Sequence, residues 1–108
     1  MNDIFTPCKV GVLNLKHRVV LAPMSRYRCT RDMAPNSMTE EYYAQRASKG
    51  GFLITEATHI NPEGTPIWNI YPEIRKNGGE APGLWTEKQT TSYQQVVRAV
   101  HSRGAYIS

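Results

Sequence analysis

The sequence has no long apolar stretch and few cysteines. Its apolar runs extend over only a few residues, far short of the roughly 20 that span a bilayer, so no membrane partner is expected. The first residues show neither the basic nor the apolar segment of a secretory leader. Two thiols, Cys8 and Cys29, without such a leader are expected to stay reduced. These absences predict a cytoplasmic protein.

Metal-ligand spacing and runs of like charge are also lacking. No Cys-x-x-Cys pair occurs, and the three histidines have no histidine or carboxylate neighbours at ligand spacing, so no metal site is expected. The net charge of +4 comes from 13 Lys and Arg against 9 Asp and Glu, scattered in runs no longer than two. This distribution does not indicate a nucleic-acid surface, so nucleic acid is not an expected partner.

What is present fits a modest globular α/β chain. Among 108 residues, 40% are apolar and 20% are charged, a balance typical of folded rather than disordered proteins. The strongest single stretch runs from Val19 to Arg28. An apolar run of strand character stops at Pro23, which lacks an N–H and cannot sit in a central strand. The segment that follows is either a solvated basic turn or the polar end of a strand that builds a site.

A strand–helix–strand unit is predicted around this stretch. With Thr39 as its N-cap, a helix is expected to run through Lys49 and to stop at Gly50-Gly51. The apolar run 52–58 then predicts a second strand, parallel to the first. Upstream, residues 10–20 predict a short hairpin whose polar turn is at residues 16–18.

The second half of the chain repeats the pattern. Residues 59–85 hold several prolines and glycines and are expected to be irregular, with Trp68, Tyr71 and Trp85 packing parts of them. Thr86 and Gln89 fit a capping box, which begins a helix that ends before Gly104. Its predicted buried face consists of Tyr93, Val96, Val97 and Val100. A third strand begins at Ala105, so the pattern is a hairpin, about two βα units and the start of another strand, which predicts a larger parallel architecture.

Several blocks of the sequence, in order, resemble the Old Yellow Enzyme family, and most of all its plant 12-oxophytodienoate reductase branch. They begin at Gly11 (Gly-x-Leu-x-Leu-Lys-x-Arg-Val-Val) and Leu21 (Leu-Ala-Pro-Met-Ser-Arg-Tyr-Arg) and continue at 42–47, 50–58, 82–89 and 97–104. The resemblance implies that residues 1–108 are a partial FMN-binding TIM-barrel domain, its N-terminal portion, incomplete at the C-terminus. It also implies that NADPH reduces FMN, which then reduces the C=C bond of a small-molecule enone, with oxylipins as candidate substrates.

The resemblance places four residues against the flavin. Pro23, Met24 and Ser25 would lie along the ring, where the Ser25 hydroxyl could donate a hydrogen bond; the family more often has Thr there. Ala57 would let the main chain approach the ring closely. The alternatives are a Ser25 hydroxyl that serves a nearby main-chain group and an alanine that only packs.

No catalytic residue is predicted within these 108 residues. The glutamine, the histidine pair, the tyrosine and the phosphate ligands that complete the family's site would all follow Ser108. Arg26 and Arg28 could orient polar groups or form a structural ion pair with Glu56. The segment 65–80 looks longer than the family's usual link. The alternative function is a non-catalytic remnant that acts as an interaction partner, and no oligomeric state is indicated.

Overall fold

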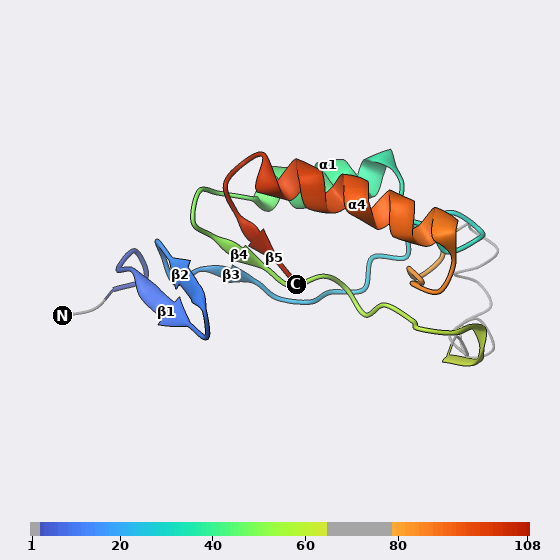
Figure 1. Ribbon diagram of the computed structural model, residues 1–108, viewed down its shortest axis with the longest axis horizontal. Helices are drawn as coiled ribbons and strands as arrows, with labels where there is room; N and C mark the ends of the chain where they lie inside the picture. Colours follow the sequence, from blue (N-terminus) through green and yellow to red (C-terminus); the bar gives the residue numbers. More distant parts are fainter. Residues whose placement is uncertain (1–2, 65–78) are drawn as a thin grey trace.

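The computed structural model describes residues 3–64 and 79–108, which form an antiparallel hairpin and a three-stranded parallel sheet covered by two helices (Figure 1). The hairpin pairs β1 (Cys8–Val10) with β2 (Leu13–Leu15). The parallel sheet has the order β3-β4-β5, in which β3 is Val20–Leu21, β4 is Phe52–Leu53 and β5 is Tyr106–Ile107.

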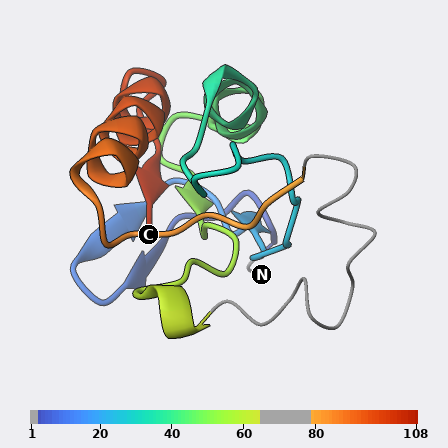
Figure 2. The ribbon, with the colours of Figure 1, turned by 90° about the vertical axis from the view of Figure 1, so that its right-hand side faces the viewer.

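Both helices cover the same face of the parallel sheet. α1 (Ser37–Arg46) lies between β3 and β4 in the chain, and α4 (Glu87–His101) precedes β5. A short 3-10 turn, η1, spans Pro62–Gly64. Figure 2, which looks along the helices, shows the two side by side on one side of the strands. This arrangement confirms the predicted parallel strand–helix–strand unit and the third strand that starts near Ala105.

The core lies between the two helices and the sheet. Its buried members come from α1, β4, α4 and the start of β5, and are Tyr43, Leu53, Val96, Val100 and Ala105. Leu21 and Ile107 pack against this cluster from the neighbouring strands. Because side chains alternate along a strand, Val20, Phe52 and Tyr106 point to the opposite face, which neither α1 nor α4 covers. Val20 is 39% exposed there.

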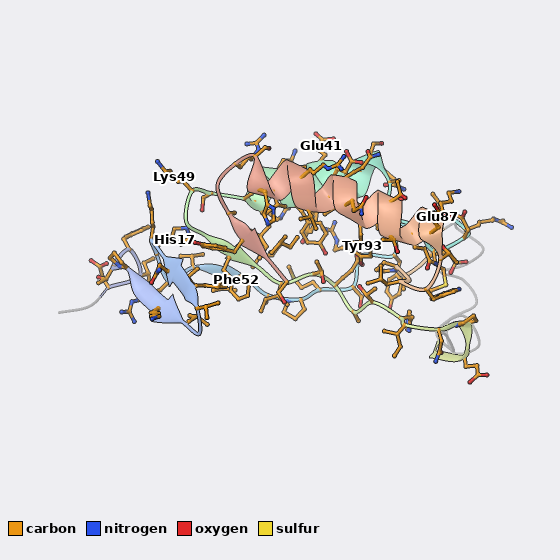
Figure 3. The ribbon with its side chains drawn as sticks, viewed as in Figure 1. His17, Glu41, Lys49, Phe52, Glu87 and Tyr93 are labelled. Carbon is orange, nitrogen blue, oxygen red and sulfur yellow. The ribbon has the colours of Figure 1, made fainter. Side chains whose placement is uncertain are left out.

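The helix α4 follows the prediction closely. Thr86 is its N-cap, and the Thr86 side chain accepts a hydrogen bond from the Gln89 N–H. In return, the Gln89 side chain accepts one from the Thr86 N–H. Val96 and Val100 are fully buried, whereas Tyr93 and Val97 are half-buried. In Figure 3, Tyr93 points from α4 toward the chain that follows β4. Among the described residues, no helix combines the length and apolarity of a membrane span.

The predicted boundaries of α1 were wrong at both ends. Asn36, not Thr39, is the N-cap: its side chain accepts from the Met38 and Thr39 N–H groups. Thr39 instead occupies the third helical position, where its hydroxyl accepts from the Asn36 N–H and completes the capping box. The helix ends at Arg46, because Ala47 turns to an extended conformation, and Gly50 with φ of 74° redirects the chain into β4.

The hairpin exists, but its turn was misplaced. The chain reverses at Gly11-Val12 between β1 and β2, and Gly11 has φ of 58°, which a glycine adopts without steric cost. The predicted turn at residues 16–18 instead joins the hairpin to β3, which belongs to the other sheet. β3 and β4 are also shorter than the apolar runs that predicted them. Trp68 and Tyr71, expected to pack, lie outside the described residues, as does most of the segment 65–80.

Candidate functional site

The predicted flavin contacts lie at the carboxyl ends of two neighbouring strands. Pro23, Met24 and Ser25 follow β3, Ala57 follows β4, and all four residues are exposed. Because β3 and β4 are parallel neighbours, the two segments that follow them leave the sheet at the same edge. This edge is where ligands bind in parallel α/β folds.

The exposed surface of this edge suits a flat ligand. Met24 is 50% exposed, Ala57 carries only a methyl group, and Pro23 has no N–H. Among the described residues, no hydrogen bond involves the Ser25 hydroxyl, so the hydroxyl is available as a donor to a ligand carbonyl. The residues present therefore fit one side of a flavin ring, although the assignment of the four contacts stays a prediction.

A buried carboxylate, that of Glu56, contacts the main chain of this edge. Glu56 is 4% exposed, and its Oε2 accepts a hydrogen bond of 2.8 Å from the main-chain N–H of Arg26. The N–H of Glu56 donates to the hydroxyl of Tyr43, at 2.9 Å. Glu56 therefore connects the chain after β3 with helix α1, and it stands next to Ala57.

The two arginines that follow Ser25 do different things. The guanidinium of Arg26 lies 3.8 Å from the centroid of the Tyr42 ring, and that of Arg46 lies 3.9 Å from the same ring. The contact between Arg26 and Glu56 thus runs through the Arg26 main chain, while the guanidinium stacks on an aromatic face. Arg28 is exposed and helps to line a cavity of about 160 Å³ beside Glu56 and Thr39.

The titratable groups around Glu56 form a buried cluster. Burial raises the pKa of the Glu56 carboxyl, opposed by the Arg26 N–H and by the Arg26 charge. Burial likewise raises the pKa of Tyr43 to about 12 and that of Cys29 to about 12. It also raises the pKa of Tyr93, whose hydroxyl lies 2.7 Å from Thr58 Oγ1. The thiol of Cys29 is therefore protonated and unreactive at neutral pH.

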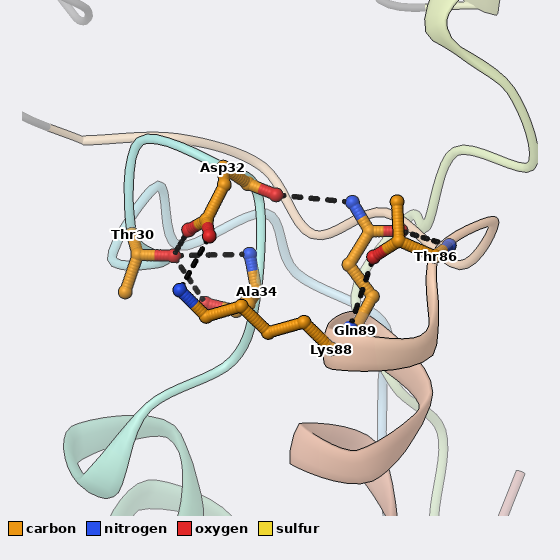
Figure 4. A network of polar contacts seen from close by, with 6 residues as sticks. All are labelled: Thr30, Asp32, Ala34, Thr86, Lys88 and Gln89. Carbon is orange, nitrogen blue, oxygen red and sulfur yellow. Dashed lines mark hydrogen bonds and ion pairs between the residues drawn. The ribbon is translucent and has the colours of Figure 1, made fainter.

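A second network fixes the loop after β3 to the start of α4 (Figure 4). The Gln89 side chain is 1% exposed; its Oε1 accepts from the N–H groups of Trp85 and Thr86, and its Nε2 donates to the Asp32 carbonyl at 3.0 Å. Lys88 forms an exposed ion pair with Asp32 at 2.5 Å, which lowers the pKa of the Asp32 carboxyl.

At Gly83, the main chain of the segment before α4 lies close to its neighbours. The N–H of Gly83 donates to the Met33 carbonyl, and a Cβ at Gly83 would lie 2.3 Å from the Trp85 ring and 2.8 Å from Gln89 Nε2. Any larger residue at this position would have to displace the ring or the amide. The segment 79–85 is thereby held across the end of the sheet, between the loop after β3 and the chain after β4.

Sequence reasoning gave no site role to Tyr43, and it considered Glu56 only as a partner in an ion pair. The ring of Tyr43 is buried in the core, while its hydroxyl accepts from the Glu56 N–H. The one available signal was Glu56 itself, a carboxylate at the end of an apolar run. Its actual donor is a main-chain group 30 residues earlier, which no local pattern identifies.

Comparisons with known proteins agree with the geometry. A sequence model of the NADH:flavin oxidoreductase / NADH oxidase family matches residues 3–108. The NADP-dependent oxidoreductase lnbE of Aspergillus flavus is 38% identical over 108 residues, which are 99% of this chain and 26% of lnbE. The 12-oxophytodienoate reductase 1 of Oryza sativa subsp. japonica is 42% identical over 102 residues, which are 94% of this chain and 24% of the rice protein.

Among solved structures, Old Yellow Enzyme from Pichia sp. AKU4542 matches with a TM-score of 0.81 at 34% identity, over 96% of this chain and 24% of that chain. The chain therefore spans about a quarter of the length of these relatives. The fold is that of the hairpin and first βα units of a (β/α)8 barrel, with a candidate ligand-binding edge at the carboxyl ends of its strands. The chain belongs to the NADH:flavin oxidoreductase family, that of Old Yellow Enzyme.

Proposed function

We propose that the protein takes part in an FMN-dependent oxidoreductase reaction, in which NADPH is used to reduce the C=C bond of α,β-unsaturated carbonyl compounds. The observation that carries the proposal is the exposed edge of Pro23, Met24, Ser25 and Ala57 in a chain of this family. The name of lnbE, an NADP-dependent oxidoreductase, supports NADPH as the reductant. The name of the rice reductase supports an oxylipin enone, 12-oxophytodienoate, as a candidate substrate.

When bound, FMN supplies the hydride-transfer chemistry, and the residues of this chain bind and orient its ring. Ser25 would donate from its hydroxyl to a ring carbonyl and so would favour negative charge on the ring. Pro23 and Met24 give apolar contact, and the small side chain of Ala57 permits close approach. Ser25 lacks the methyl group of a threonine, so its rotamer is less restricted and its effect on the flavin is smaller.

The test is a fluorescence titration of FMN with the 108-residue chain, run beside circular dichroism. Saturable quenching is expected, weakened roughly threefold to tenfold in Ser25→Ala, since a hydrogen bond contributes about 0.5–1.5 kcal/mol. Ser48→Ala, at the opposite end of the sheet, is the matched control and should leave the affinity unchanged. A folded chain without quenching would contradict the proposal.

A second candidate function is a non-catalytic interaction partner. It is favoured by the edges of the parallel sheet, because in the described part of the chain β3 and β5 each pair on one side only. A folded chain that binds no FMN but associates with itself or with another chain, measured by analytical ultracentrifugation, would favour this alternative.

A further inference from the structure

Glu56 is placed to control the geometry of both predicted flavin-contacting segments. Its Oε2 holds the main-chain N–H of Arg26, the residue directly after Ser25. Ala57 is the residue directly after Glu56 itself. One side chain therefore sets the distance between the two segments whose exposed residues are proposed to meet the ring.

Glu56 is itself held on both sides of its own main chain. Its N–H donates to the Tyr43 hydroxyl at 2.9 Å, and its carbonyl accepts from Thr58 Oγ1 at 2.9 Å. Thr58 Oγ1 also contacts the hydroxyl of Tyr93 on α4, at 2.7 Å. The main chain of Glu56 is thus fixed to α1 directly and to α4 through Thr58, while the main chain after β3 is fixed to the Glu56 carboxylate.

We propose that Glu56 is a positioning residue of the flavin site, whose buried carboxylate holds the Ser25–Arg26 main chain next to the segment that carries Ala57. This inference rests on the proposed function. Glu56 does not touch the ring in this account; it acts through the Arg26 N–H. Removal of the carboxylate would leave that N–H without its acceptor and free the Ser25 hydroxyl to move away from the ring carbonyl.

The strength of this contact depends on the charge of Glu56. An ionised carboxylate accepts more strongly than a protonated one. The groups that face it are the Arg26 main chain and charge, Tyr43 of α1, Tyr93 of α4 and the Cys29 thiol, with Arg28 on the same cavity. The buried carboxyl of Glu80 also acts on Cys29, which pairs with it in the main chain. The tyrosines and the thiol remain protonated through neutral pH because burial raises the pKa of each. Glu56 is the carboxyl that accepts from the Arg26 N–H, so its ionisation changes this contact directly as the pH rises from acid toward neutral.

The first measurement follows the Arg26 amide of the wild-type chain by ¹H–¹⁵N NMR as the pH is raised. We expect its proton shift to move with the ionisation of Glu56, at a pH above the ordinary range of a glutamate. The affinity for riboflavin, measured by fluorescence, should rise over the same pH interval. Riboflavin is the probe because it lacks the phosphate of FMN, whose own ionisation would confuse the profile. An affinity that stays constant while the Arg26 amide titrates would overturn the inference.

The second measurement uses Glu56→Gln and Glu56→Ala, with Glu41→Gln as the matched control on the exposed side of α1 (Figure 3). Glu56→Gln keeps an acceptor, so riboflavin binding should weaken about threefold and lose its pH dependence. Glu56→Ala should weaken binding roughly tenfold. A folded Glu56→Ala chain with wild-type affinity would overturn the inference but leave the proposed function intact. Failure of the wild-type chain to bind either flavin would overturn both.

Discussion

Replacement of Gln89 with glutamate separates two roles that this side chain combines. Its Oε1 accepts from the Trp85 and Thr86 N–H groups at 2.8 and 3.0 Å, which caps α4. Its Nε2 donates to the Asp32 carbonyl at 3.0 Å, which ties the loop after β3 to α4 (Figure 4). Gln89→Glu keeps the acceptor, at nearly constant volume, and removes the donor.

The loss of the donor should dominate the change in stability. A carboxylate near the helix N-terminus gains about 0.3–1 kcal/mol from the helix dipole. Against this, an ionised carboxylate oxygen would face the Asp32 carbonyl oxygen at a position that is 1% exposed. Two hydrogen-bond acceptors would then lie next to each other with no donor between them. A buried polar contact broken in this way costs about 1–3 kcal/mol. We expect Gln89→Glu to lower the free energy of unfolding by about 1–2 kcal/mol at neutral pH.

The effect should depend on pH with a definite sign. A protonated carboxyl can donate to the Asp32 carbonyl, so the folded state holds this proton more tightly than the unfolded chain does. The pKa of the new carboxyl is therefore expected to be raised in the folded state. Its stability relative to wild type is best below the ordinary glutamate pKa and declines as the pH rises through the raised value.

The assay is urea denaturation followed by circular dichroism at about pH 4 and about pH 8, on either side of the expected transition. Gln95→Glu, an exposed position on the same helix, is the control and should change stability by less than about 0.5 kcal/mol. Equal stability of wild type and Gln89→Glu at about pH 8 would refute the role of the donor. A loss that is the same at both pH values would refute the protonation argument.

Two further substitutions test the supports of the site and of α1. Tyr43→Phe should cost about 1–3 kcal/mol of unfolding free energy, because the buried N–H of Glu56 loses its acceptor, whereas Tyr42→Phe on the same helix should cost little; equal effects in urea denaturation would contradict this. Asn36→Ala should cost about 1 kcal/mol or more, because it removes both the α1 cap and the Nδ2 hydrogen bond to the Arg28 carbonyl; Asn36→Ser keeps a cap and should lose less, and equal losses in the two variants would refute the capping role.

The elements that the sequence predicted well carry their signals within a few residues. The capping box of Thr86 and Gln89 involves main-chain groups three positions apart, so its pattern is visible without the fold. The stop before Gly104 is of the same kind. The order of strands and helices followed from the alternation of apolar runs and caps, because a parallel strand pair requires a crossover between them.

The errors arose where two local solutions compete. Asn36 and Thr39 can each cap a helix, and the structure uses both, one as N-cap and the other at the third helical position. Likewise, a polar turn at residues 16–18 and a glycine turn at Gly11 are both plausible. The latter prevails because it pairs Leu15 with Cys8 and buries Leu15. The choice is made by packing, which the residues of the turn do not encode.

The candidate site contains two kinds of residue: exposed residues predicted to contact the flavin, and residues that hold them in place. Local sequence patterns could not reveal the second kind. The resemblance to a flavoprotein family predicts Ser25 and Ala57 as flavin contacts, because the blocks that carry it are short and local. The residues that hold those contacts in place are their immediate neighbours, Arg26 and Glu56, and the bond between them joins positions 30 residues apart. Arg26 lies beyond the end of β3, where pairing with β4 has stopped, and the buried carboxylate of Glu56, beyond the end of β4, satisfies its main-chain N–H. The same bond that removes this unsatisfied donor fixes the exposed surface above it, which is why stability and ligand binding should change together at Glu56.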